Sequence, residues 1–146
     1  MKRVYQISRG QISFLFLLIA TIFIASSVDA SGDIRIISIF HIHTKEKLTV
    51  LYKKDGKYIP EALKKLNWIL RDWRRNETIE IDPRAIDIAW EMHAELGSQM
   101  PIYIICGYRA KETNDMLRNI RGGQAYKSQH ISGKAIDLSF PDIPVR

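Results

Sequence analysis

Apolar and polar residues alternate after position 30 in short runs that are typical of β-strands. The runs 35–41 (RIISIFH) and 47–52 (KLTVLY) are rich in β-branched residues, which favour extended backbone. The polar residues 44–46 separate the two runs and predict a β-hairpin, and Asp55-Gly56 predicts a further turn. We therefore expect the folded part of the chain to begin with two antiparallel strands.

Three later stretches carry apolar residues at the spacing of an α-helix. The first begins at Pro60 and the second at Asp82-Pro83, because proline favours the first helical position and aspartate favours the N-cap. The third covers 111–120 and ends before Gly122-Gly123. The apolar stripes of the first two helices consist of Leu63, Leu66, Leu70 and Trp73, and of Ile86, Ala89, His93 and Leu96.

Two more strands complete the predicted fold. Residues 101–106 form an almost continuous apolar run, and residues 135–140 (AIDLSF) alternate with a period of two. The sum is an α+β domain with a small antiparallel sheet and flanking helices. No repeat or linker divides residues 31–146, which are enough to bury one core, so we expect a single domain there.

The first 30 residues have the composition of a signal peptide for secretion. Lys2, Arg3 and Arg9 precede the uncharged apolar run 12–24, and Val28-Asp29-Ala30 predicts cleavage after Ala30. The run is shorter than the ~20 residues that span a bilayer, which favours cleavage over a retained anchor. We predict export to the periplasm by the general secretion route, with the membrane contacted only through this segment.

The net charge bears on the binding partners of the protein, and the cysteine content bears on its possible disulfides. The chain has 22 lysines and arginines against 16 acidic residues, a net charge of +6. An exported protein rarely meets nucleic acid, so we expect no nucleic-acid partner, and the charge suits an anionic cell envelope equally well. Cys106 is the only cysteine, which excludes an intramolecular disulfide. Since it ends an apolar run, we interpret it as a small core residue and not as a nucleophile.

One segment contains residues that can bind a metal ion. His130 offers an imidazole nitrogen and Asp137 a carboxylate oxygen, and both are ordinary zinc ligands. Ser132-Gly133 permits a tight turn that brings the two side chains together. Asp137 lies on the face of strand 135–140 opposite its apolar side chains, where it can point at an ion. By their residue types alone, a metal site and a surface loop with a glycine turn explain this pair equally well.

The same segment resembles a known family. The residues that carry the resemblance are Ser128, His130, Gly133, Ala135 and Asp137, preceded by Gly107-Tyr108-Arg109 and Thr113-Asn114. This pattern is similar to that of the YcbK-like murein endopeptidases, which belong to the zinc peptidase superfamily that includes D-alanyl-D-alanine carboxypeptidases. The likeness extends over residues 35–142 and implies the zinc peptidase fold shared by these carboxypeptidases and hedgehog-like domains.

The resemblance implies a zinc cofactor and a peptidoglycan substrate. Zinc is expected on His130 and Asp137, where it would lower the pKa of a water molecule to ~7 and polarise the carbonyl of a peptide cross-link. Arg109 is the expected catalytic residue, because a guanidinium can grip a substrate carboxylate or the developing oxyanion. A structural ion pair is the alternative interpretation of Arg109.

Three further residues of the pattern have two interpretations each. Ser128 and Asn114 could orient the zinc ligands, or they could be a turn residue and a helix-start residue. Tyr108 could line the substrate cleft, or it could simply pack against the core. We predict that all three lie beside the site and contribute to ligand orientation or substrate binding.

The sequence departs from the family in its last part. The family continues into a strand that bears a third zinc-ligand histidine, whereas no histidine follows His130 here. His41 and His43 lie in the first strand region and His93 on a helix stripe, so they are poor substitutes. We expect the fold to lack its C-terminal part and zinc to bind weakly. Cys106 replaces a small hydroxyl residue of the family, a difference that we expect to be structural.

Three interpretations of the function follow. The first is a cell-wall zinc endopeptidase that acts on the peptide stems of peptidoglycan. The second is an exported, non-catalytic module that binds peptidoglycan through Arg109 and the remaining cleft. The third is an inactive, shortened product that does not fold stably. We predict that residues 31–146 alone show no peptidase turnover.

Overall fold

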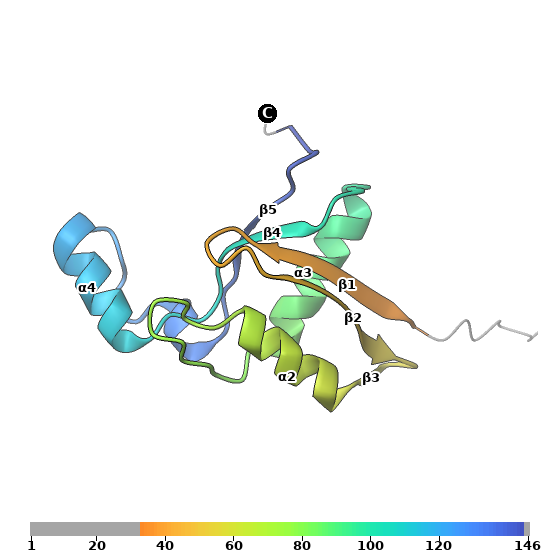
Figure 1. Ribbon diagram of the computed structural model, residues 1–146, viewed down its shortest axis with the longest axis horizontal. Coiled ribbons are helices and arrows are strands. Elements are labelled where there is room, and N and C mark those ends of the chain that lie inside the picture. Colours follow the sequence, from red (N-terminus) through yellow and green to blue (C-terminus); the bar gives the residue numbers. More distant parts are fainter. Residues whose placement is uncertain (1–32, 145–146) are drawn as a thin grey trace, which may run out of the picture. The chain divides into compact units, whose positions relative to one another are not determined.

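The computed structural model describes residues 33–144, and the predicted signal segment 1–30 lies outside the described residues. The elements, shown in Figure 1, are β1 (Arg35–His41), β2 (Lys47–Lys54), β3 (Lys57–Tyr58), α2 (Pro60–Ile69), α3 (Pro83–Glu95), β4 (Ile102–Cys106), α4 (Lys111–Arg121), a 3-10 helix (Gln129–Ser132) and β5 (Asp137–Ser139). Within the described residues, no helix has the length and apolar character needed to cross a bilayer.

The strands form one sheet with the order β3-β2-β1-β4-β5. The predicted hairpin is confirmed, since β1 pairs with β2 in antiparallel fashion. The α+β class is also confirmed, but β1 and β4 run parallel, so the sheet is mixed and not wholly antiparallel as predicted. The physical reason is the long connection through α2 and α3, which lets the chain return to the same end of the sheet before β4 begins.

Helices α2 and α3 cover one face of the sheet and enclose the core (Figure 1). Alternate residues of β1 point inward: Ile37 and Ile39 are 3% and 2% exposed, whereas Ile36, which points to the opposite face, is 54% exposed. Leu66 of α2 and Ile86 of α3 are 0% and 1% exposed. Each such side chain contributes roughly 1.5–3 kcal/mol when fully buried.

The predicted helix starts are confirmed, and one helix is shorter than predicted. Pro60 and Pro83 stand at the starts of α2 and α3, and the Asp82 side chain accepts the N–H of Arg84 at 3.0 Å. Helix α2 ends at Ile69, so the chain has already left the helix at Trp73. A bridge between the backbones of Asp72 and Glu77 closes the loop that follows.

The last strand is shorter than predicted but has the predicted faces. Strand β5 covers Asp137–Ser139, whereas the pattern predicted 135–140. Leu138 and its apolar neighbours Ile136 and Phe140 pack against the core, and Asp137 is exposed on the other face. The period-two pattern therefore predicted the side-chain directions correctly although the hydrogen-bonded ladder includes only three residues.

A partly buried carboxylate, Asp87, ties α3 to the first three strands of the sheet. Asp87 accepts hydrogen bonds from the hydroxyls of Tyr52 at 2.8 Å and Tyr58 at 2.7 Å, and from the Lys53 ammonium at 2.9 Å. Arg35 lies 3.3 Å from the same carboxylate. Burial raises the pKa of Asp87, but the hydrogen bonds from Lys53, Tyr58 and Tyr52 outweigh burial and hold this pKa below its ordinary value.

Replacing Asp87 by asparagine is expected to destabilise the fold by about 1–3 kcal/mol, because an amide N–H₂ would face hydrogen-bond donors. The lowered pKa also makes Asp87 stabilising above the ordinary aspartate value of 3.8 and progressively less so as the pH falls through its folded-state pKa. Urea unfolding at neutral pH and at about pH 3 measures both effects. Asp87→Asn should therefore lose more stability at neutral pH than at acid pH.

The matched control is Asp55→Asn, at an exposed turn position that asparagine tolerates well. It should change the free energy of unfolding by less than about 0.5 kcal/mol at either pH. Equal effects of the two substitutions would show that Asp87 does not anchor α3.

Candidate metal centre

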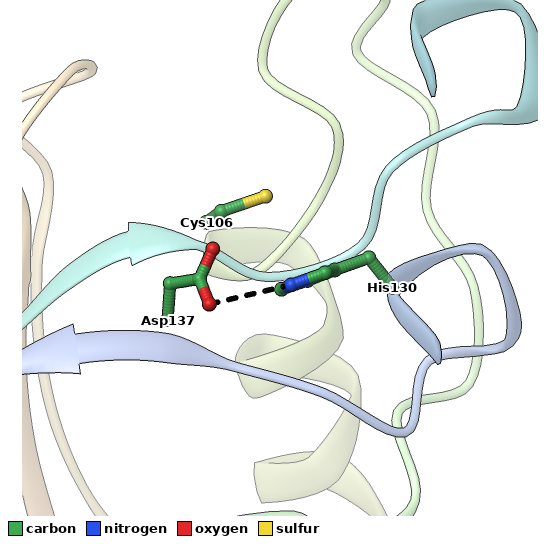
Figure 2. A group of neighbouring side chains, drawn as sticks. All are labelled: Cys106, His130 and Asp137. Carbon is green, nitrogen blue, oxygen red and sulfur yellow. Dashed lines mark ion pairs between the residues drawn. The ribbon is translucent and has the colours of Figure 1, made fainter. Parts of the chain in front are cut away.

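Three metal-binding side chains meet where β4 and β5 approach the 3-10 helix. One donor atom each of Cys106, His130 and Asp137 lies within 4.8 Å of the other two. Figure 2 shows His130 reaching from the 3-10 helix toward Asp137, with Cys106 on the neighbouring strand. In the part of the chain that the structure describes, this is the one group of three or more such side chains. The predicted proximity of His130 and Asp137 is thus present in the fold.

The pairing of β4 with β5 places Cys106 next to Asp137. The register runs Ile104 opposite Leu138 and then Cys106 opposite Asp137, so Ile105 is an extra residue on β4. Such a β-bulge redirects the residues that follow it. Without the bulge, Ile105 would stand opposite Asp137. Because directly opposed residues have neighbouring Cβ atoms, the bulge brings a thiol to the carboxylate in place of an isoleucine.

The 3-10 helix and its glycine end hold His130 in position. Gly133 has φ +66°, in the left-handed region, and a Cβ there would lie 2.9 Å from the carbonyl oxygen of Glu80. This position therefore requires glycine. The carbonyl of Gly133 accepts the N–H of Asp82 at 2.9 Å, which joins the turn to the start of α3. The tight turn predicted at Ser132-Gly133 is confirmed.

One hydrogen bond fixes the tautomer of His130. Its Nδ1 lies 2.8 Å from the carbonyl oxygen of Gly107, which can only accept, so Nδ1 carries the hydrogen. The Nε2 atom then presents a lone pair in the neutral ring, and it lies 3.3 Å from Oδ1 of Asp137. Two acceptors at this distance repel each other unless a proton or a metal ion lies between them.

The acid–base properties of the site agree with this geometry. The Cys106 thiol raises the pKa of His130, and the Gly107 carbonyl and the Asp137 charge act in the same direction against burial. Burial raises the pKa of Cys106, but His130 and Arg109 outweigh it and hold this pKa below the ordinary thiol value. Both shifts reflect how closely the imidazole, the thiol and the guanidinium lie to one another.

Arg109 borders the donor group. Its Nη2 atom donates to Sγ of Cys106 at 3.3 Å and lies 3.9 Å from Oδ2 of Asp137. Its Nη1 atom lies 3.4 Å from Oδ1 of Asn114. The Arg109 side chain is only 14% exposed, so the positive charge stays beside the site.

The other predicted residues lie around this arginine with different contacts. Asn114 is fully buried and donates to the carbonyl of Ala125 at 3.0 Å, so it holds Arg109 and the loop after α4 and touches neither predicted ligand. Ser128 is the N-cap of the 3-10 helix without a side-chain cap bond. Tyr108 packs against the core, and its N–H donates to the carbonyl of Leu70 at 2.7 Å.

Sequence reasoning missed two residues that build the site. Cys106 was expected in the core, but its side chain is half-buried and belongs to the donor group. The pattern could not reveal this, because the bulge at Ile105 reverses the expected direction of the side chain. Asp72, 2% exposed, accepts the N–H groups of Ala110 at 3.0 Å and Arg74 at 3.0 Å, and thereby fixes the backbone just after Arg109.

The remaining histidines take no part in the donor group. His41 is 1% exposed, and its Nδ1 accepts the N–H of His43 at 3.2 Å, while His43 stacks on Trp73. The Nε2 atom of His93 lies 2.8 Å from the carbonyl oxygen of Met100. These contacts agree with the prediction that the three histidines are poor substitutes for a ligand.

The donor types fit a zinc ion. A thiolate, an imidazole nitrogen and a carboxylate oxygen are all ordinary zinc ligands, and the tautomer of His130 leaves the nitrogen nearest Asp137 free. The Nδ1 bond to a backbone carbonyl is also the contact that orients metal-binding histidines in general. The Asp137 side chain is 50% exposed, so the donor group is open to solvent on that side.

The fold and the donor group together define a small α+β domain with a potential metal centre at one end of its sheet. The chain belongs to the family described as peptidoglycan L,D-endopeptidase MepK, whose model matches residues 29–146. The resemblance to murein endopeptidases is therefore confirmed.

Individual relatives agree with the family. The peptidoglycan L,D-endopeptidase MepK of Escherichia coli K12 is 37% identical over 109 residues, which cover 75% of this chain and 60% of the relative. The probable peptidoglycan L,D-endopeptidase MepK of Haemophilus influenzae is 36% identical over 112 residues, 76% of this chain and 60% of the relative. The aligned part of the chain thus spans 60% of the length of these relatives. The comparison with solved structures gave no significant match.

Asp72→Asn is expected to destabilise the protein by about 1–3 kcal/mol, because the amide cannot accept both backbone N–H groups with the strength of a carboxylate. Since Ala110 directly follows Arg109, the loss should also loosen the arginine beside the donor group. Urea unfolding measures the first effect, and the NMR line widths of the Arg109 guanidinium measure the second.

The matched control is Glu77→Gln in the same loop, which breaks only the exposed ion pair to Arg75. It should cost at most about 1 kcal/mol and leave the Arg109 signal unchanged. If Asp72→Asn behaved like this control, Asp72 would have no part in positioning the site.

Proposed function

We propose that this protein is an exported zinc endopeptidase that acts on peptide cross-links of peptidoglycan. The observation that carries the proposal is the lone pair of His130 Nε2, 3.3 Å from the Asp137 carboxylate and fixed in direction by the Gly107 carbonyl. The named activity of the family relatives supports the same bond class, an L,D-linkage in peptidoglycan.

In this proposal, His130 and Asp137 hold the zinc ion. Zinc, when bound, supplies a Lewis acid that polarises a peptide carbonyl and lowers the pKa of water. The chain itself orients the imidazole through Gly107 and keeps the carboxylate on a strand end that is open to solvent. The strand that carries the carboxylate and the short helix that carries the histidine are rigid elements, which suits residues that bind a metal ion.

Arg109 binds the substrate in this proposal. Its guanidinium lies beside the donor group, 3.9 Å from Asp137, where it can pair with a carboxylate of a peptide stem. Peptidoglycan stems carry such groups, and a bidentate pair fixes both the position and the direction of the peptide. Asn114 supports this role because it holds Nη1 of the same guanidinium.

The proposed location is the periplasm. The basic residues, the apolar run 12–24 and the small residues before Ser31 support export by the general secretion route with cleavage after Ala30. The proposed partner, peptidoglycan, lies in the same compartment. Residues 31–146 then form the endopeptidase domain.

The zinc ligands are tested by cleavage of purified peptidoglycan, with the released peptides separated by chromatography. The proposal requires cleavage by the wild-type protein that a chelator abolishes and zinc restores, and this result would overturn the sequence-based prediction that residues 31–146 alone show no turnover. His130→Ala and Asp137→Ala should each reduce it by at least about 100-fold, since each removes a ligand of the metal that drives the reaction.

His43→Ala is the control, because it removes an exposed histidine outside the donor group. It should keep full, zinc-dependent cleavage. Cleavage that persists under chelation would falsify the proposed mechanism. Binding to peptidoglycan without any cleavage by the wild-type protein would instead favour a non-catalytic binding module.

Arg109→Ala is expected to raise KM for a cross-linked stem peptide by about 10- to 100-fold, because a charge-assisted hydrogen bond contributes about 1.5–3 kcal/mol. The KM of Arg109→Lys should lie between those of the wild-type protein and Arg109→Ala, since lysine keeps the charge but cannot form a bidentate pair. Steady-state kinetics with a soluble stem peptide measures both. Arg74→Ala, at an exposed arginine stacked on Trp73, should leave KM unchanged. An unaltered KM in Arg109→Ala would leave this arginine with a structural role only.

A further inference from the structure

We propose that Cys106 is a third ligand of the metal ion, so that zinc is held by a thiolate, an imidazole and a carboxylate. The inference rests on the proposed function, because it concerns the same site. Cys106 ends an otherwise apolar strand. Its sulfur lies within 4.8 Å of the donor atoms of His130 and Asp137.

The backbone is shaped to bring the thiol to this place. The bulge at Ile105 puts Cys106 directly opposite Asp137, on the same face of the sheet. The next residue, Gly107, accepts the hydrogen bond that aims the ring of His130. Two successive residues of one strand end therefore present the sulfur and orient the imidazole, and both arrangements depend on the same short backbone segment.

The contacts of the sulfur are polar. Sγ accepts a hydrogen bond from Arg109 at 3.3 Å and lies 3.7 Å from the carbonyl oxygen of Gly107. A cysteine that merely fills a core contacts apolar side chains. Here a guanidinium stabilises negative charge on the sulfur, which is the form that binds metals.

The charges and the coordination number suit zinc. Binding replaces the thiol proton, which passes to solvent, with a zinc–sulfur bond, and the neutral imidazole binds through Nε2. The thiolate and the carboxylate together balance the charge of Zn²⁺. These three ligands would occupy three of the four positions of a tetrahedral zinc ion. The Asp137 side chain is 50% exposed, so the ion would be open to solvent on that side.

The test uses cobalt(II) as a spectroscopic substitute for zinc in the full chain, purified under reducing conditions. Thiolate bound to cobalt(II) produces an intense near-ultraviolet charge-transfer band that imidazole and carboxylate ligands do not produce. Because Cys106 is the only cysteine, the band can come from no other residue. We expect the band in the wild-type protein and its loss in Cys106→Ser and Cys106→Ala.

Two further measurements accompany the spectra. Zinc affinity, from competition with a chromophoric chelator, should fall by more than about 10-fold in both variants, since even residues that only support ligands cause losses of that size. In the wild-type protein, zinc should slow alkylation of the thiol by iodoacetamide at least about 10-fold. This last measurement needs no substitution, so it holds even if a variant fails to fold.

The outcomes separate this inference from the proposed function. Cobalt bound without the charge-transfer band, together with unchanged zinc affinity in Cys106→Ala, would overturn the role of Cys106 and leave a metal site of His130 and Asp137. A wild-type protein that shows the band but cleaves no peptidoglycan would support the ligand and contradict the endopeptidase. No metal binding at all would overturn both.

Discussion

The close approach of Gly107 to the end of α2 is the constraint on which both the core and the candidate metal centre depend. A Cβ at this position would collide with the backbone of Leu70, whose carbonyl accepts the N–H of Tyr108 at 2.7 Å. The carbonyl of Gly107 in turn accepts from Nδ1 of His130 at 2.8 Å. The packing of α2 against the sheet and the direction of the imidazole are therefore set by the same peptide units, and a change in one must shift the other.

Electrostatics explains why such an arrangement is retained in a small domain. His130 is 9% exposed and faces a carboxylate and a thiol, a group that is costly to bury unless its charges are compensated. Part of the compensation comes from Arg109, whose guanidinium lies 3.3 Å from Sγ of Cys106 and 3.9 Å from Oδ2 of Asp137. A divalent ion among the three donor atoms would add further compensation, with Arg109 at the edge of the site.

Membership of the family and the donor atoms of the candidate site rest on different observations. Membership follows from the match of the family model to residues 29–146. The alignment with the relatives covers 60% of their length and leaves 40% outside the comparison. Cys106 offers a soft thiol donor, which zinc accepts more readily than magnesium or calcium. Its role is a question of coordination chemistry that sequence similarity alone does not answer.

The sequence by itself determined four of the five strands, the helix starts, the glycine turn at Gly133 and the pair His130 and Asp137, because these follow from local periodicity, capping and residue chemistry. Only the tertiary structure decided the parallel pairing of β1 with β4, the bulge at Ile105 and the support that Asp72 gives to Ala110. These features depend on contacts between segments far apart in the chain. A one-residue bulge leaves no mark in a hydrophobic pattern, yet it turned Cys106 away from the core and toward Asp137.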